Sequence, residues 1–219
     1  MSRFVDLSHA IADGLTTYPG LPVPRISDHL SREDSAAHYA AGTTFQIGRI
    51  EMVANTGTYL DVPFHRYARG FDLSHLPLAS AADLPGIAFR ANPEDRAVDR
   101  RLFEGRDLRG KAILVHTGWD RHWGTSGYFE GHPFLTRDAV EYLTAAGAAL
   151  VGIDSLNIDD TADGVRPAHS ILLRNEIPIV EHLCNLQQLP DSGFRFFAVP
   201  VKVKGMGSFP VRAFAIVDR

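Results

Sequence analysis

The stretch that decides the fold class is TRDAVEYLTAAGAALVGIDS, residues 136–155. Thr136 is a good N-cap residue, Asp138 lies in the first turn, and apolar residues recur at helical spacing. Gly147 is a common signal for the end of a helix. The segment ALVGIDS follows at once and has the composition of a buried strand. A helix followed directly by a buried strand indicates an α/β fold.

Other segments extend this pattern. KAILVHTGW, residues 111–119, begins as a buried strand and ends at a turn, which completes a strand–helix–strand unit. LTTYPGLPVPR, residues 15–25, contains three prolines and a glycine and is predicted to be a loop. We expect one α/β domain over residues 1–219, with a mixed sheet, few helices and long functional loops. The remaining predicted strands lie at 4–8, 44–55, 86–90, 177–181, 195–202 and 211–218.

The composition excludes several classes of protein. A chain of 219 residues with 45% apolar composition is enough for one domain with a full core. The net charge of −4 and the scattered basic residues argue against binding to nucleic acid or to an anionic membrane. The single cysteine, Cys184, excludes an intramolecular disulfide and a cysteine-based zinc site. No apolar run reaches the roughly 20 residues that span a bilayer. MSRFVDLSHAI does not resemble a signal peptide, so we expect a cytoplasmic protein.

His65 stands out among the ten histidines. It closes the segment NTGTYLDVPFH, residues 55–65, and follows Asp61 by four positions. Pro63 fixes its own backbone angle and restricts the residue before it, so His65 lies on a stiff loop that could hold it for proton transfer. The simpler interpretation is a loop histidine that is hydrogen-bonded to the backbone.

A second pair of interest is His169 and Glu181. RPAHSILLRNEIPIVEH places His169 before a short helical turn and Glu181 at the end of a predicted strand. Carboxylates at the carboxyl ends of buried strands often contribute to the functional sites of α/β folds. A surface glutamate that ends a strand is the alternative interpretation.

The motif at 55–65 also carries a family resemblance. It is similar to His-x-Gly-Thr-His-x-Asp-x-Pro-x-His, the signature of the cyclase family that includes bacterial kynurenine formamidase and isatin hydrolase. The resemblance covers nearly the whole chain and implies a mixed, partly barrel-like sheet of the swivelling β/β/α type. Further matching segments are VDLSHAI, TTYPGLP, LVHTGWDRHW, HPFLTRDAVEYL, VGIDSLNID and VKVKGMGSFPVRAFAIV.

The resemblance implies roles for five residues. In dinuclear members of the family, the motif aspartate bridges to a second metal, which a later histidine and a glutamate twelve residues further on also hold. Asp61, His169 and Glu181 match these metal ligands. His65 matches the proton-transfer histidine of the family, and Tyr18 matches an aromatic substrate contact.

Asn55 and Tyr59 depart from the family signature, because both occupy histidine ligand positions. Imidazole binds zinc or manganese well, whereas an amide oxygen is a weak ligand and a tyrosine with a pKa of about 10 is mostly protonated at pH 7. We therefore predict no dinuclear centre. At most one zinc or manganese ion is expected, held by Asp61, His169 and Glu181. If the site is empty, Tyr59 should donate a hydrogen bond to Asp61 or face the substrate.

Three functions remain open at this level. The first is hydrolysis of a small aromatic amide or lactam, assisted by one metal ion, with His65 moving protons. The second is a metal-free cyclase or lyase acting on a polyketide-like compound, in which Asn55 stabilises an enolate, Tyr59 is the acid, and His65 or Glu181 is the base. The third is a binding protein without catalysis. The candidate walls of the substrate pocket are Tyr18, Phe64 and Trp119.

The expected partners are a small-molecule substrate and further copies of the chain. A proline-rich arm at 15–25 would need a partner surface to be ordered, so we expect a homodimer or a higher homo-oligomer.

Overall fold

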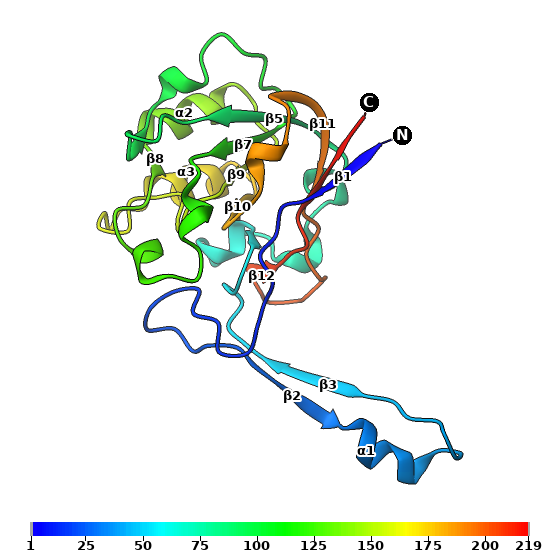
Figure 1. Ribbon diagram of the computed structural model, residues 1–219. Coiled ribbons are helices and arrows are strands. Elements are labelled where there is room, and N and C mark those ends of the chain that lie inside the picture. Colours follow the sequence, from blue (N-terminus) through cyan, green and yellow to red (C-terminus); the bar gives the residue numbers. More distant parts are fainter. Residues whose placement is uncertain (1, 219) are drawn as a thin grey trace.

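A nine-stranded sheet forms the centre of the structure, a computed structural model that describes residues 2–218. The strands follow the order β1-β13-β11-β5-β7-β9-β10-β4-β12. Neighbours from β5 to β10 run parallel and all other neighbours run antiparallel, so the sheet is mixed, as predicted. It curls into a half-barrel (Figure 1). The strands are β1 (Arg3–Asp6), β4 (Tyr59–Asp61), β5 (Leu84–Arg90), β7 (Ala112–His116), β9 (Leu150–Ile153), β10 (Ile179–Glu181), β11 (Ser192–Phe197), β12 (Ser208–Pro210) and β13 (Phe214–Val217).

Two apolar layers cover the faces of this sheet. Side chains alternate along a strand, so Ile113 and Val115 of β7 point to one face and Leu114 points to the other. The helices α2 (Arg137–Ala145) and α3 (Pro167–Arg174) pack on the first face. The second face lines the inside of the curl. It includes Leu7, Leu60, Leu150 and Phe196, which are all fully buried.

The helix predicted at 136–147 is confirmed. Thr136 is the N-cap, α2 runs from Arg137 to Ala145, and Gly147 has a positive φ of 79° that ends it. The strand β9 follows, as predicted from ALVGIDS. The short helical turn expected at His169 is the longer helix α3, which begins at Pro167. Proline is favoured at the first position of a helix because its missing N–H would be unpaired there.

Most predicted strands are also confirmed, with shifted ends. Seven strands of the large sheet fall within or overlap predicted segments; they are β1, β5, β7, β9, β10, β11 and β13. The segment 44–55 contains β3 (Ile47–Glu51), but this strand ends before the motif instead of running into it. β4 and β12 were not predicted, because each has only three residues and neither lies in a longer apolar segment such as the one that contains β10. The small parallel pair β6 (Ala97–Val98) and β8 (Phe134–Leu135) is shorter still.

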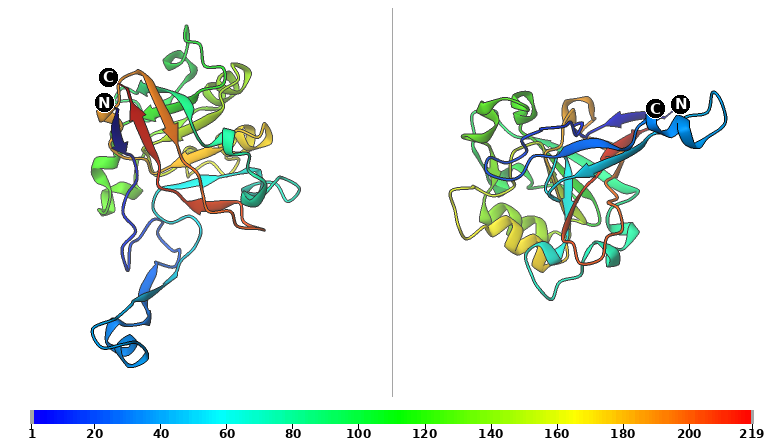
Figure 2. Two further views of the ribbon diagram at one scale, coloured as in Figure 1. Left: turned by 90° about the vertical axis from the view of Figure 1, so that its right-hand side faces the viewer. Right: turned by 90° about the horizontal axis from the view of Figure 1, so that it is seen from below.

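An arm of the chain projects from the body in every view (Figures 1 and 2). It consists of β2 (Arg25–Leu30), β3 and the short helix α1 (Arg32–Ser35). The predicted position of this arm, 15–25, is wrong. That segment is a loop, but it packs on the body, where Thr17 is buried and Tyr18 joins a buried hydrogen-bond network.

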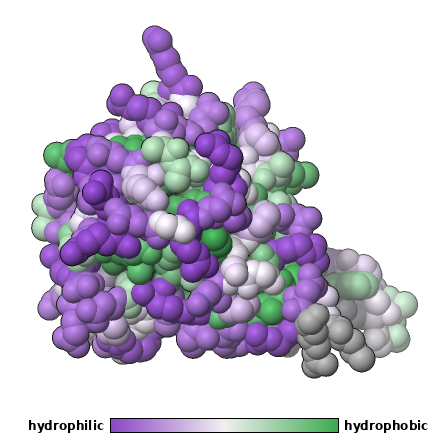
Figure 3. Space-filling view, turned by 90° about the horizontal axis from the view of Figure 1, so that it is seen from above, coloured by the Kyte–Doolittle hydropathy of each residue, from purple (hydrophilic) through white to green (hydrophobic). Residues whose placement is uncertain are grey.

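The end of the body opposite the arm is mainly hydrophilic, with small apolar patches (Figure 3). Within residues 2–218, no helix is both long enough and apolar enough to cross a membrane.

Candidate active site

The site is built on β4, the short strand inside the motif. Tyr59 and Asp61 are two residues apart and point to the same face, while Leu60 between them enters the apolar core. In the flanking antiparallel strands, Glu181 of β10 lies opposite Tyr59, and Ser208 of β12 lies opposite Asp61. Directly opposite side chains come into contact. The register of the sheet therefore creates two polar pairs.

Ser208 connects Asp61 to His65, which lies on the 3₁₀ turn after β4. The Oγ of Ser208 contacts Asp61 Oδ1 and lies 2.8 Å from His65 Nδ1. A carboxylate can only accept, so the single serine proton goes to Asp61, and Nδ1 of His65 must be the donor to Oγ. The lone pair of the neutral imidazole is then on Nε2. Gly207 allows this close approach, because a Cβ there would lie 2.2 Å from the His65 backbone nitrogen.

His169 is oriented by a carboxylate at the start of α3. Asp159 accepts hydrogen bonds from the backbone nitrogens of Ala168 and His169, at 2.6 and 3.0 Å, and from His169 Nδ1 at 2.7 Å. The other ring nitrogen, Nε2, then faces Asp61 Oδ2 at 3.6 Å and Glu181 Oε1 at 3.7 Å. All of these side chains except that of His169 are fully buried.

The electrostatics of this cluster favour a positive charge. Burial lowers the pKa of His169, but Glu181, Asp159 and Asp61 raise it more in sum, to about 10. Burial in turn raises the pKa of Glu181. The carboxylates thus stabilise a cation beside His169 Nε2, whether it is a proton or a metal ion.

The donor atoms fit one divalent cation. Asp61 Oδ2 is buried and has no hydrogen-bond partner within the described part of the chain. Its distance of 3.6 Å from His169 Nε2 is close to the roughly 3.4 Å between ligands that surround an ion at about 2.1 Å. Ligand atoms of Asp61, His65 and His169 all lie within 4.8 Å of one another, and Glu181, which the sequence analysis expected as a ligand, is not part of this group. Imidazole nitrogen with carboxylate oxygen is a donor set that suits zinc or manganese.

Tyrosines form the other side of the site. The Tyr59 hydroxyl donates to Glu181 Oε2, because the β4–β10 register places these residues opposite each other. The expectation that Tyr59 donates to Asp61 is therefore wrong, although Tyr59 does line the cavity. Burial and then the Glu181 charge hold the pKa of Tyr59 well above 10, so it keeps its proton. The Tyr18 hydroxyl lies 2.9 Å from that of Tyr59 and donates to the carbonyl of Leu156 at 2.6 Å.

His182 completes the tyrosine network. Its backbone has a positive φ of 55°, which turns the chain at the end of β10. The ring is fully buried, with Nε2 3.2 Å from the Tyr18 hydroxyl and Nδ1 2.9 Å from the Tyr128 hydroxyl. Because the Tyr18 proton goes to Leu156, His182 Nε2 donates to Tyr18, and Tyr128 donates to His182 Nδ1. Burial lowers the pKa of His182 well below 6.5, which keeps the ring neutral.

A cavity of about 350 Å³ opens over these residues. Asp61 and Glu181 lie fully buried beneath it. The structure therefore brings together every residue proposed from the sequence for catalysis or metal binding. Asn55 lines the cavity, and its side-chain amide has no hydrogen-bond partner among residues 2–218. The residues from the sequence analysis that line the cavity are Tyr18, Asn55, Tyr59, His65 and His169.

Phe64 and Trp119 do not line this cavity. The Trp119 indole donates to the carbonyl of Tyr128 at 3.0 Å and packs against His122, so it is held in a separate loop. Phe64 lies on the 3₁₀ turn before His65 and is half-buried outside the cavity lining. Leu21 provides an apolar wall that the sequence analysis did not identify.

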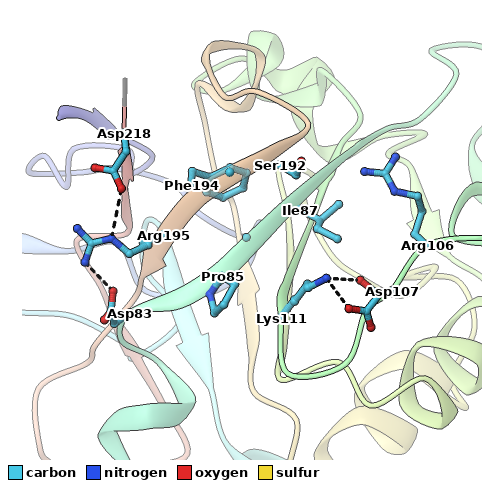
Figure 4. Close-up of a pocket in the computed structure, with 12 residues that line it drawn as sticks. Asp83, Pro85, Ile87, Arg106, Asp107, Lys111, Ser192, Phe194, Arg195 and Asp218 are labelled. Atoms are coloured by element: carbon cyan, nitrogen blue, oxygen red, sulfur yellow. Dashed lines mark hydrogen bonds and ion pairs between the residues drawn. The ribbon is translucent and has the colours of Figure 1, made fainter. Parts of the chain in front are cut away.

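Two other features lack the chemistry of the site. A larger hollow of about 600 Å³ lies at β5 and β11 (Figure 4), but its lining contains no histidine, and Arg195 and Lys111 are paired with Asp83 and Asp107. The ligand atoms of His116, Asp120 and Asp154 also lie within 4.8 Å of one another. There, Asp154 already accepts three hydrogen bonds from Thr117 and Gly118, and burial raises its pKa to about 7.

The sequence analysis missed Asp159, Ser208 and His182. Asp159 and Ser208 lie in segments that carry the family resemblance, VGIDSLNID and VKVKGMGSFPVRAFAIV, but nothing in their spacing links them to a histidine. His182 directly follows Glu181, and only its positive φ turns its ring toward Tyr18.

Comparison with known proteins agrees with this fold. Kynurenine formamidase of Bacillus cereus is 25% identical over 213 residues, which is 97% of this chain and 96% of that protein. Isatin hydrolase A from Labrenzia aggregata, solved with benzyl benzoate, superposes with a TM-score of 0.84 at 21% identity, over 100% of this chain and 94% of that one. A structure described as a potential metal-dependent hydrolase with cyclase activity gives a TM-score of 0.82 at 22% identity, over 100% of both chains.

The sequence model of the family described as "Putative cyclase" matches residues 5–160, which include β4, the 3₁₀ turn of His65 and Asp159. This match covers more than half of the chain. The family expected from the motif is therefore confirmed: the chain belongs to the putative cyclase family.

Proposed function

We propose that this chain is a C–N hydrolase that cleaves a small aromatic amide or lactam, with His65 as the proton-transfer residue. Relatives over nearly the full length are named kynurenine formamidase, and structural neighbours are named isatin hydrolase. A cavity of about 350 Å³ is at the small end of ligand sites and suits a molecule with one ring and short substituents.

The observation that carries this proposal is the 2.8 Å contact between His65 Nδ1 and Ser208 Oγ, from which the proton order at His65 is inferred. Its Nδ1 is held by Ser208, whose own proton is directed to Asp61. The ring lines the cavity, so Nε2 is the nitrogen available to a reacting water or amide. A neutral imidazole with one nitrogen fixed and the other free is the arrangement required of a general base.

The proposed reaction requires two proton transfers. Water adds to the carbonyl carbon while His65 Nε2 takes its proton. The same nitrogen then gives that proton to the leaving amide nitrogen as the C–N bond breaks. The products are a carboxylic acid and an amine. The unpaired amide of Asn55 is available to donate a hydrogen bond to the carbonyl oxygen as it becomes negative, a contribution of about 3 kcal/mol in known oxyanion holes.

We further propose that one divalent ion, zinc or manganese, is held by Asp61, His169 and Glu181. The unpaired Asp61 Oδ2 and its 3.6 Å spacing from His169 Nε2 support two of these ligands, whereas the group of ligand atoms within 4.8 Å of one another contains His65 and not Glu181. A bound ion lowers the pKa of water toward about 7 and polarises a carbonyl oxygen. His65 stays free for proton transfer because Ser208 holds its Nδ1.

The metal-free cyclase or lyase is the second candidate. The position of Asn55 in the cavity lining favours this second candidate, since an amide N–H can stabilise an enolate as well as a tetrahedral oxyanion. Tyr59 is the acid in the cyclase or lyase mechanism, but its hydroxyl donates to Glu181 instead of pointing its proton into the cavity. This hydrogen bond counts against Tyr59 as the acid, so we rank hydrolysis first. A binding protein without catalysis would have no use for the directed proton order at His65.

Product analysis with formanilide and isatin tests the proposal. We expect aniline and formate from formanilide, or ring-opened isatinate from isatin. His65→Gln should reduce kcat about 10²–10⁴-fold. His75→Gln is the matched control, because His75 is exposed and bonds only to Asp72 and Ser74 of its own loop. Full activity in His65→Gln, or loss of water in place of C–N cleavage, would contradict the proposal.

We also propose a homo-oligomer that forms through the arm at residues 25–51. An isolated two-stranded hairpin is marginally stable in water, and this one exposes apolar side chains that a second copy could cover. Light scattering should give a mass at least twice the 24.1 kDa of one chain. The double variant Phe45→Ser with Ile50→Ser should be a monomer. The exposed apolar residues are Ile26, Tyr39, Phe45, Ile47 and Ile50.

A further inference from the structure

Two arginines, Arg66 and Arg166, line the candidate cavity beside His65 and His169. Their guanidinium groups carry a permanent positive charge, because arginine is not deprotonated in proteins. Asp61 and Glu181 are fully buried and are absent from the cavity lining, whereas both arginines belong to the lining together with His169.

Neither guanidinium group has an ion-pair partner among residues 2–218. Arg66 Nε donates to Ser170 Oγ at 3.3 Å, and Arg166 donates to neutral oxygens of Asn157, Asp160 and Thr161 at 3.3 to 3.5 Å. These contacts are long, and each acceptor is a hydroxyl, an amide or a backbone carbonyl. The carboxylate of Asp160 is occupied by a different arginine, Arg96, at 2.7 Å.

The two arginines reach the cavity from different segments. Arg166 is the residue before the helix, and the backbone nitrogen of Ser170 donates to its carbonyl at 3.0 Å. Ser170 is therefore one turn further along the helix, and Arg66 reaches it from the turn after β4. Arg66 thus contacts the first turn of α3, while the guanidinium group of Arg166 bonds to the loop 157–161 before the helix, and both side chains line the same cavity.

The backbone of Arg166 is held in an unusual conformation. Its φ of 51° and ψ of 61° lie in the left-handed region, which costs a non-glycine residue about 1 kcal/mol or more. Strain of this kind occurs often at functional sites. This backbone conformation puts the Arg166 side chain at the cavity, instead of a backbone N–H group of the helix N-terminus. The first helical N–H groups are already taken by Asp159.

We propose that Arg66 and Arg166 bind a carboxylate on the substrate, so that the enzyme selects anionic aryl amides over neutral ones. This inference rests on the proposed hydrolysis. Asp61 and Glu181 beneath the cavity would repel an anion, and two guanidinium groups at the entrance offset that repulsion. Guanidinium matches the planar geometry of a carboxylate with paired N–H donors, which makes it selective for this group.

The direct test compares kcat/KM for formanilide with that for its ortho, meta and para ring carboxylates, the formamidobenzoates. The wild type should prefer at least one formamidobenzoate by 10-fold or more, and added salt should reduce this preference. Arg66→Gln and Arg166→Gln should each reduce the preference about 10-fold, and Arg66→Lys should retain part of it. Arg69→Gln, an exposed arginine on the same loop, is the matched control and should keep the wild-type preference.

Equal kcat/KM for neutral and anionic amides, or a preference that survives in the Arg66→Gln, Arg166→Gln double variant, would overturn the inference. A binding measurement separates this result from a failure of the proposed function. If none of the amides is hydrolysed, benzoate should still raise the melting temperature of the wild type more than benzamide does. That difference should disappear in the double variant, and its persistence there would also overturn the inference.

Discussion

Two sides of the same cavity differ in how their polar atoms are satisfied. The histidine side contains Asp61, His65, Asp159, His169 and Ser208, and the tyrosine side contains Tyr18, Tyr59 and His182. Glu181 lies between them, with Oε1 3.7 Å from His169 Nε2 and Oε2 bonded to the Tyr59 hydroxyl. On the histidine side, Asp61 Oδ2 is buried without a hydrogen-bond partner and lies 3.6 Å from His169 Nε2, and Nε2 of His65 is left free by the hydrogen bond at Nδ1. On the tyrosine side, each of these side chains has a hydrogen-bond partner of its own.

This difference arises from two residues of one strand, Tyr59 and Asp61. A buried polar atom without a partner costs about 1–3 kcal/mol, so it identifies a position where a ligand or ion would be stabilised. On the tyrosine side every polar hydrogen has an acceptor, so no ligand or ion is needed there to satisfy a buried atom. We conclude that chemistry is concentrated on the histidine side and that the tyrosine side is structural support for it.

Removing the unpaired carboxylate should have the largest effect. Asp61→Asn deletes one charge of the cation site and replaces one of the two acceptor oxygens by an NH₂ group, which competes with the hydrogen bond from Ser208. We expect hydrolysis to fall about 10³-fold, since metal assistance contributes several kcal/mol. Asp191→Asn, an exposed carboxylate next to Arg90, is the control and should behave as wild type. A fall of less than 10-fold would remove Asp61 from the mechanism.

Disturbing the support of His169 should have a smaller effect. Asp159→Asn keeps one acceptor oxygen but directs an NH₂ group at donors that now bond to a carboxylate. We expect zinc or manganese affinity and kcat to fall about 10–100-fold, as for other carboxylates that orient a metal-binding histidine. Asp160→Asn disrupts only the Arg96 pair and a loop contact, and is the matched control. Unchanged metal affinity would contradict the assigned role.

On the tyrosine side the main loss should be in stability. Tyr59→Phe removes a hydroxyl from Glu181 and from Tyr18, and leaves buried acceptors with fewer donors. The free energy of unfolding should fall by about 1–3 kcal/mol, while kcat changes less than 10-fold. Tyr142→Phe, a partly exposed tyrosine of α2, controls for loss of a hydroxyl alone. A 100-fold loss of kcat in Tyr59→Phe would support the cyclase or lyase chemistry instead.

The smallest effect at neutral pH comes from the titration of His182. Burial holds the pKa of His182 well below 6.5, so below that pH the unfolded chain binds a proton that the folded chain does not. Stability should therefore be lost as the pH falls below 6.5, by about 1.4 kcal/mol per pH unit for this one group. Urea unfolding of metal-free protein between pH 4.5 and 8 measures it. His182→Gln should have a shallower acid slope, and parallel curves for the two proteins would contradict the assignment.

The sequence was most informative where a pattern repeats or a motif is dense. The helix at 136–147 and the strands around it follow from periodicity and end signals, which are local properties. Asp61, His65, His169 and Glu181 meet at one cavity as the family resemblance implied. The strand pairing that unites them joins β4 to β10 and β12, segments more than 100 residues away in the chain, and no local pattern encodes that pairing.

The predictions that the structure contradicts, and the residues that they missed, have physical explanations. Ser208 acts only through the β4–β12 register, and Tyr59 contacts Glu181 instead of Asp61 through the β4–β10 register. The indole N–H of Trp119 donates to a backbone carbonyl away from the cavity, which holds the side chain outside the lining. The arm was placed in the proline-rich segment, but Tyr18 of that segment is anchored by its hydroxyl in the buried network.

The central claim is that the histidine side forms a single cation site and that the tyrosine side is closed to metal. Elemental analysis of metal per chain tests it most directly, after loading with excess manganese or zinc and removal of free ion by gel filtration. Asn55→His with Tyr59→His, which restores both family ligands, is measured alongside. We predict one equivalent in the wild type, none in Asp61→Asn and a second equivalent in the double variant. Two equivalents in the wild type would contradict the account.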